Sequence, residues 1–204
     1  MTALVLGLVL FLGVHSMRVF ADGWRTGMVR RMGEMPWKGL YSVVSIAGFA
    51  LLVWGYGQAR QQPVVLWEPP AFMRHVTALV MLPVFVLFVA AYVPGNVFKA
   101  RLRHPQVLSV KLWALAHLLA NGNLADVLLF GSFLVWAVAD FRAARNRDRV
   151  AAGSPHDPVA AASAPAVPRP AGSGGTIVCL VLGLAVYAAF IFGLHQWLIG
   201  VRPV

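Results

Sequence analysis

The sequence predicts an all-α protein, a polytopic membrane helix bundle with about six transmembrane helices. Apolar residues make up 59% of the 204 residues and charged residues only 12%, whereas soluble domains carry about 25% charged residues. The mean hydropathy is +0.73. A soluble domain of this size could not hide so much apolar surface, because roughly half of its residues meet water. We therefore expect lipid to surround most of this chain.

Six apolar segments have the composition of membrane spans, which need about 20 residues each. The fourth is short, and the Asn121-Gly122-Asn123 turn after it predicts a tight hairpin with the fifth. Pro83 lies inside the third and should kink it, which membrane helices tolerate when neighbours satisfy the freed backbone groups. The predicted spans are residues 2–21, 38–57, 72–93, 106–121, 124–141 and 176–199.

The spans divide the chain into a five-helix membrane core (1–150), a linker (151–175) and a sixth transmembrane helix with a short tail (176–204). The linker consists mostly of Ala, Pro, Gly and Ser, a composition that cannot bury enough apolar surface to fold. We expect it to be disordered and cytoplasmic. Residues 22–37, where Trp and Met alternate with Arg, predict either an interfacial amphipathic helix or an ordinary basic loop.

The basic residues predict the orientation, because cytoplasmic loops are rich in Lys and Arg. With six spans, 14 of the 17 basic residues fall on one side, and only Arg60, Arg74 and Arg202 on the other. We expect a multi-pass membrane protein with both termini on the side opposite the cytoplasm. The alternative, that the first span is a cleaved signal peptide, is disfavoured because the sequence starts without a basic segment.

The net charge of +10 would favour nucleic-acid binding in a soluble protein. Here the basic residues sit between apolar runs, so we expect membrane lipid and no nucleic acid as partner. The single cysteine, Cys179, excludes a disulfide scaffold, a structural zinc finger and covalently attached c-type haem.

Ionisable side chains within apolar spans are functional candidates, and His15 and His117 stand out because His75 and His195 lie near the outer interface. His15 is three residues from Arg18, and His117 is six from Lys111. If these cations mark the cytoplasmic interface, the two imidazoles lie about 4.5 and 9 Å into the membrane, at about 1.5 Å per residue. Two imidazoles at similar depth on different helices are what the axial ligands of haem b require, and the cations for its propionates could come from Arg18, Arg101, Arg103 and Lys111.

Trp113, His117 and Asn121 recur at four-residue spacing and should line one helix face, so Trp113 and Asn121 would line the haem pocket. From spacing alone, another metal site, a quinone site or a structural hydrogen bond to a neighbouring helix stay open. The acidic residues are assigned to loops, with Asp126 outside and Asp148 in the cytoplasm. The remaining histidines and the tryptophans near span ends are assigned to interfaces and loops; they are His75, His104, His156, His195, Trp54, Trp67, Trp136 and Trp197.

Several motifs together support a family resemblance. The most specific is Trp113-x-x-x-His117-x-x-x-Asn121-Gly122, and the others are His15-Ser16, Gly33-Glu34, Trp37-Lys38-Gly39-Leu40-Tyr41-Ser42, Ala91-Tyr92, His104-Pro105-Gln106 and Leu129-Phe130-Gly131. These motifs, which span most of the chain outside the linker, resemble those of the NnrU family of bacterial inner-membrane proteins.

The resemblance implies a context of nitrite and nitric oxide reduction in denitrification. The family is also similar to the plant 15-cis-zeta-carotene isomerase, a membrane haem b enzyme whose two histidine ligands correspond to His15 and His117. That likeness implies isomerase-like redox-haem chemistry on an apolar lipid or polyene substrate. The isomerase has a cysteine where this chain has Ala114, so the cysteine as an alternative ligand is missing. Two other classes of function stay open, a non-enzymatic factor that assembles or stabilises a respiratory complex, and a small transporter.

Overall fold

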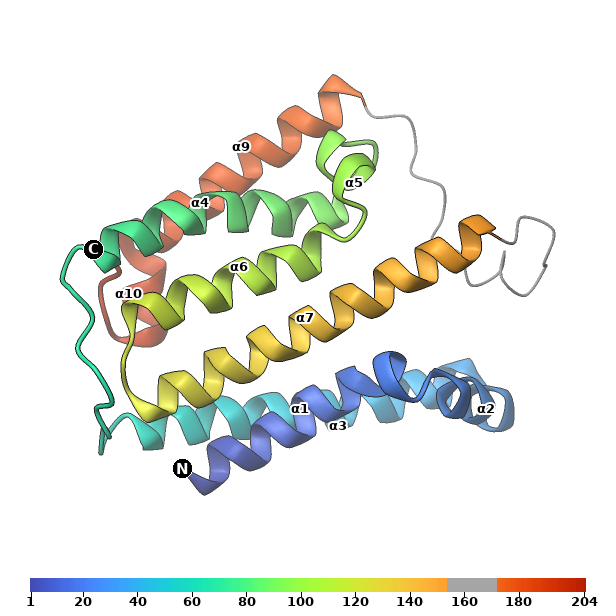
Figure 1. Cartoon of the computed structure of the whole chain (residues 1–204), viewed down its shortest axis with the longest axis horizontal. Coiled ribbons are helices and arrows are strands. Elements are labelled where there is room, and N and C mark those ends of the chain that lie inside the picture. Colours follow the sequence, from blue (N-terminus) through green and yellow to red (C-terminus); the bar gives the residue numbers. More distant parts are fainter. Residues whose placement is uncertain (154–171) are drawn as a thin grey trace. The chain divides into compact units, whose positions relative to one another are not determined.

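The computed structural model describes residues 1–153 and 172–204, and it is all-α, as predicted (Figure 1). The described residues contain no strand, only an isolated bridge between Val65 and Asn123. The α-helices are α1 (Thr2–Phe20), α2 (Asp22–Met32), α3 (Glu34–Ala59), α4 (Met73–Tyr92), α5 (Val97–Leu102), α6 (Pro105–Ala120), α7 (Leu124–Gly153), α9 (Ser173–Ala189) and α10 (His195–Ile199), with the π-helical turn η1 (Phe190–Leu194) joining the last two.

All six predicted spans are helical, and among the described residues five helices are long and apolar enough to cross a membrane by length and composition. These are α1, α3, α4, α7 as far as Val150, and the continuous run from Ser173 to Ile199. The sixth, α6, has 16 residues, or about 24 Å, which is short of the roughly 30 Å of a bilayer core. Several apolar helices of this kind are the pattern of a multi-pass membrane protein.

Three segments differ in their bounds from the sequence prediction. Residues 22–32 form the helix α2, the helical one of the two alternatives predicted for residues 22–37, and Gly33 with a φ of 87° separates it from α3, which begins at Glu34 rather than at Lys38. Helix α7 continues through a charged stretch to Gly153 instead of ending at residue 141. The predicted linker 151–175 lies largely outside the described residues, but its first three residues end α7 and residues 173–175 begin α9.

The chain packs as two compact units. The first comprises Met1–Glu68 and Asn121–Asp140, and the second comprises Pro69–Ala120 and Phe141–Val204. Helix α7 therefore begins in the first unit, and its residues from Phe141 onward belong to the second.

In the first unit, α1 and α3 run antiparallel and touch backbone to backbone (Figure 1). A Cβ atom added to Gly7, Gly48 or Gly55 would lie closer than 3.0 Å to backbone atoms of Leu52, Phe11 or Leu4, respectively. Small residues allow helices in lipid to approach this closely, because packing replaces the hydrophobic effect as the driving force. The contacts fix the register, with Phe11 opposite Gly48.

The same unit contains residues 60–68 of the connection between α3 and α4. This segment is hydrogen-bonded to the predicted turn after α6. The amides of Leu66 and Trp67 donate hydrogen bonds to the Gly122 carbonyl at 2.8 and 3.2 Å, and the Leu124 amide donates to the Val64 carbonyl at 2.8 Å. These bonds satisfy backbone groups that neither helix can pair internally.

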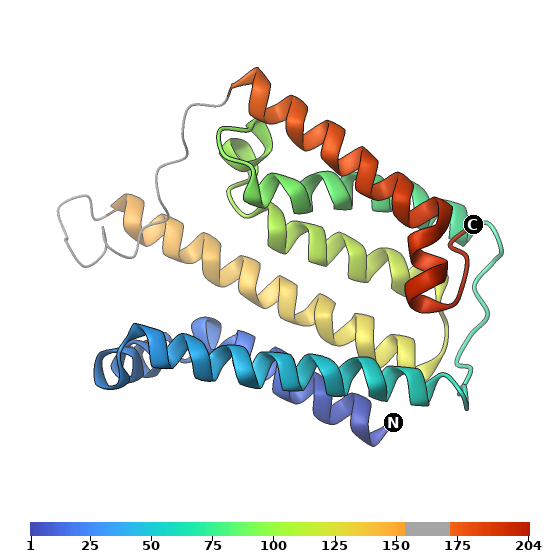
Figure 2. The same cartoon turned by 180° about the vertical axis from the view of Figure 1, so that it is seen from behind.

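In the second unit, α4 lies between α6 and α9 (Figure 2). A Cβ on Gly183 of α9 would lie 2.7 Å from Cα of Val86, so these helices also meet at a glycine. On the other side, the Thr77 hydroxyl of α4 donates a hydrogen bond to the Ala116 carbonyl of α6 at 2.8 Å. Pro83 lies within α4, which is assigned as one helix across it.

Candidate functional site

His15 is half-buried in the first unit, near the end of α1. Its ring Nδ1 lies 2.6 Å from the Phe11 carbonyl oxygen, one turn earlier in the same helix. A carbonyl oxygen only accepts hydrogen bonds, so Nδ1 carries the proton in this pair. In the neutral ring the lone pair is therefore on Nε2, the nitrogen that can bind a metal or accept a proton.

Aromatic rings from three helices surround His15. Its ring centroid lies 4.3 Å from that of Phe11, 5.4 Å from that of Tyr41 on α3, and 6.2 Å from that of Trp136 on α7. The Tyr41 and Trp136 rings are edge-on to the imidazole, an arrangement that aromatic rings prefer to stacking face to face. The imidazole is thus held in an aromatic cage formed by Phe11, Tyr41 and Trp136.

The cage corrects the interpretation of Trp136 as an interfacial belt residue. Trp54, Trp67 and Trp197 are 59%, 42% and 78% exposed, as belt residues would be. The Trp136 indole instead packs against His15, and its Nε1 is buried without a hydrogen-bond partner among the described residues.

His117 belongs to the second unit and shows the same local geometry in α6. Its Nδ1 lies 2.8 Å from the Trp113 carbonyl oxygen, and its ring centroid lies 5.4 Å from that of Trp113. The bond from Thr77 to the Ala116 carbonyl fixes α6 to α4 at the residue before His117. Both candidate ligands thus have Nδ1 bonded to their own helix and the lone pair of the neutral ring on Nε2.

The other predicted site residues are distributed over both units. Arg18 lies in the last turn of α1, in the unit of His15. Lys111 lies in the unit of His117, with its Nζ 5.0 Å from the centroid of the Phe141 ring, a cation–π contact. Asn121 lies one residue beyond the end of α6 and groups with the first unit. Of the three residues predicted to share one helix face, Trp113 and His117 lie on α6 and Asn121 does not.

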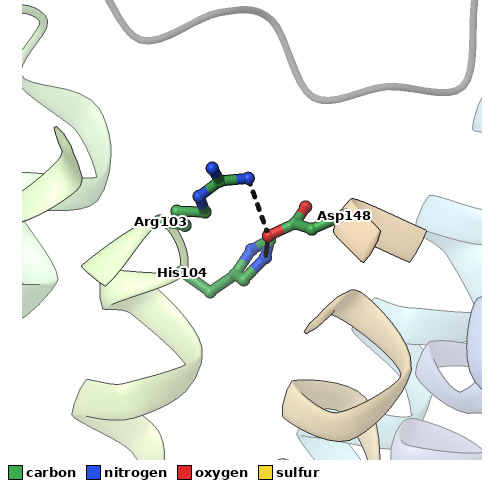
Figure 3. Close-up of polar contacts among 3 residues, drawn as sticks. All are labelled: Arg103, His104 and Asp148. Carbon is green, nitrogen blue, oxygen red and sulfur yellow. Dashed lines mark hydrogen bonds and ion pairs between the residues drawn. The ribbon is translucent and has the colours of Figure 1, made fainter. Parts of the chain in front are cut away.

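Sequence analysis missed a buried ion-pair cluster in the second unit. Asp148, expected in a cytoplasmic loop, has a side chain that is only 5% exposed. Its Oδ2 lies 3.0 Å from His104 Nε2 and 3.6 Å from an Arg103 guanidinium nitrogen (Figure 3). Arg103 has a φ of +63°, a conformation that non-glycine residues adopt rarely. The cluster joins the α5–α6 corner to the charged end of α7.

A second missed acid is Asp126 in the first unit, which is 3% exposed. Its Oδ1 accepts a hydrogen bond from the Tyr56 hydroxyl at 2.6 Å, and its Oδ2 accepts one from the Asn123 amide at 2.9 Å. Both oxygens are therefore satisfied within the protein, as buried carboxylates require. In the sequence, Asp126 is an acidic residue at the start of an apolar segment. A position in an outer loop explains that pattern as well as a buried position does.

The fold and these sites define a multi-pass helical membrane protein with one caged histidine in its first unit and a similarly bonded histidine in its second. The chain belongs to the NnrU family, whose profile it matches over residues 3–203, nearly its whole length. No curated protein and no solved structure matches the chain.

Proposed function

We propose that this NnrU-family protein binds haem b, with His15 and His117 as the two axial ligands, and acts in nitrite and nitric oxide metabolism. One observation carries the proposal: in both histidines Nδ1 pairs with the carbonyl oxygen four residues earlier, at 2.6 and 2.8 Å. Metal-ligating histidines almost always donate their second ring N–H in this way, which fixes the tautomer and raises the basicity of the ligating nitrogen.

The surroundings of the two histidines suit the rest of the cofactor. A porphyrin is flat and apolar except for two carboxylates, and the spans that carry His15 and His117 are apolar helices with aromatic side chains beside each imidazole. Arg18 in the last turn of α1 and Lys111 in the middle of α6 supply positive charge on the same helices. Such cations stabilise carboxylates where the dielectric constant is low.

When bound, a haem held by two imidazoles supplies one-electron redox chemistry. The chain's own contribution is to hold the rings: each Nδ1 bond limits rotation of its imidazole, and Tyr41 and Trp136 pack against the edges of the His15 ring. Isomerase-like action on an apolar lipid or polyene would require one imidazole to leave its ligating position. The Nδ1 bonds oppose that movement, so we favour electron transfer over isomerisation.

The test is the absorbance spectrum of the full chain purified in detergent after expression with ample haem. We expect a Soret band with the low-spin signature of two imidazole ligands. His15→Ala and His117→Ala should each remove that signature, and added imidazole should restore it. His75→Ala is the matched control, because His75 is exposed in the second unit, and it should leave the spectrum unchanged.

Two outcomes would overturn the proposal. One is a wild-type protein without a Soret band. That result would favour the non-enzymatic assembly factor, which predicts that respiratory subunits co-purify with the chain. The other is an undiminished band in the His15→Ala, His117→Ala double variant, which would show that other residues hold the haem.

A further inference from the structure

The Trp136 Nε1–H in the first unit is buried and has no partner among the described residues, whereas the buried Ser45 hydroxyl interacts with the Tyr41 side chain, one turn earlier in α3. Buried polar groups in folded proteins are nearly always paired, and leaving one unpaired costs about 1–3 kcal/mol. Within a membrane span water does not compensate for the missing bond. The Trp136 donor therefore points to a partner that is not part of the polypeptide.

Trp136 packs against His15, and Ser45 lies on a different helix at a neighbouring level. The Trp136 ring on α7 is edge-on to the imidazole, with centroids 6.2 Å apart. On α3, the antiparallel register with Phe11 opposite Gly48 brings Ser45 level with Val14, the neighbour of His15. A molecule held by His15 would thus have the Trp136 donor within reach on the α7 side.

We propose that the Trp136 indole N–H donates a hydrogen bond to a propionate carboxylate of the haem held at His15. This inference rests on the proposed function. Haem b offers acceptors only on its two carboxylates, because iron occupies its pyrrole nitrogens. A carboxylate near the membrane interior needs charge-assisted hydrogen bonds to offset its desolvation. Arg18, three residues beyond His15, adds positive charge on the same side.

The test compares Trp136→Phe, which keeps a ring and deletes the N–H, with the wild-type holoprotein. Deleting a donor leaves the carboxylate more negative, which stabilises the ferric state over the ferrous state. We expect the ferric-to-ferrous equilibrium to shift about tenfold toward ferric, equal to about 59 mV for one electron. Haem transfer to a soluble acceptor protein should become about tenfold faster. In the haem-free protein Trp136→Phe removes an unpaired donor. The melting temperature of the haem-free variant should therefore equal or exceed that of the haem-free wild type.

Two controls assign the effect to the carboxylate. Trp54→Phe removes an exposed indole of the same unit and should change neither the potential nor haem transfer. Reconstitution with the dimethyl ester of haem b, which lacks the carboxylate charge, should abolish the difference between Trp136→Phe and wild type. Wild-type protein with a Soret band but no effect of Trp136→Phe would overturn this inference alone, as would an effect that persists with the ester. Absence of a Soret band in the wild type would overturn the proposed function and this inference together.

Discussion

The Tyr56 hydroxyl donates a hydrogen bond to Oδ1 of Asp126 across 2.6 Å, although 70 residues separate the two in the chain. The bond joins α3 to the first turn of α7 within the first unit. Because Asp126 is 3% exposed, this bond and the one from Asn123 replace the water that the carboxylate loses on folding. The pair is therefore an anchor for the helix that carries Trp136.

Tyr56→Phe should lower the free energy of unfolding by about 1–3 kcal/mol, the usual cost of leaving a buried acceptor unpaired. Reversible unfolding in mixed detergent and SDS micelles measures it. Tyr92→Phe is the matched control, because Tyr92 is 64% exposed and its hydroxyl accepts an exposed bond from Gln106. Equal losses in the two variants would contradict a special role for the Tyr56–Asp126 bond.

Gly55→Ala should disrupt the packing of α1 on α3, because the new Cβ would meet the backbone of Leu4 closer than 3.0 Å. Overpacking of this kind costs about 1–3 kcal/mol or more. Gly57→Ala, two residues away with nothing within 4 Å of the added Cβ, should leave stability unchanged or raise it, since alanine favours helix over glycine. The same unfolding assay distinguishes the two variants. A Gly55→Ala variant as stable as the wild type would show that α1 and α3 are not in close backbone contact at Gly55.

Asp148→Asn should destabilise the second unit by about 1–3 kcal/mol, because it removes the charge that pairs with His104 and Arg103 in a buried position. The control is Asp22→Asn, whose ion pair with Arg25 spans 3.7 Å with the carboxylate side chain 50% exposed. Exposed pairs contribute about 0–1 kcal/mol. Combining Asp148→Asn with His104→Gln should cost less than the sum of the two single losses, since both delete one interaction. Additive losses would argue against that coupling.

Thr77→Val should weaken the attachment of α6 to α4, because it removes the donor to the Ala116 carbonyl. Interhelical bonds of this kind in membranes average about 0.6 kcal/mol, so we expect a small loss in the unfolding assay. Thr26→Val, which deletes an exposed bond within α2, is the control and should have no measurable effect. A larger loss in Thr26→Val than in Thr77→Val would contradict the assignment.

Hydropathy predicted the helices of this chain well, because an apolar run of about 20 residues has few alternatives to a membrane helix. It failed where a helix continues with charged residues. The stretch from Arg142 to Gly153 contains too many cations to score as a span, yet it stays helical while Asp148 packs against His104. That contact joins residues 44 positions apart, and composition contains no information about it.

The candidate site was predictable in part. His15 and His117 stand out because imidazoles are rare in apolar spans, and their bonds to the carbonyls four residues earlier follow from helix geometry once the rings turn toward their own helix. The cage around His15 was not predictable, since Tyr41 and Trp136 come from other helices. Trp136 was assigned to the interface because its position near a span end does not distinguish a lipid-facing ring from a packed one.

The close fit of α1 on α3 has a consequence for biosynthesis. These helices are made before α7, and their glycine contacts need nothing synthesised later. Trp136 follows the end of α3 by 77 positions (136 − 59), which takes about 4–15 s at bacterial translation rates of about 5–20 residues per second. During that interval Trp136 is absent and His15 contacts only Phe11 and Tyr41 of its three ring neighbours, so a molecule can reach His15 before Trp136 packs against it.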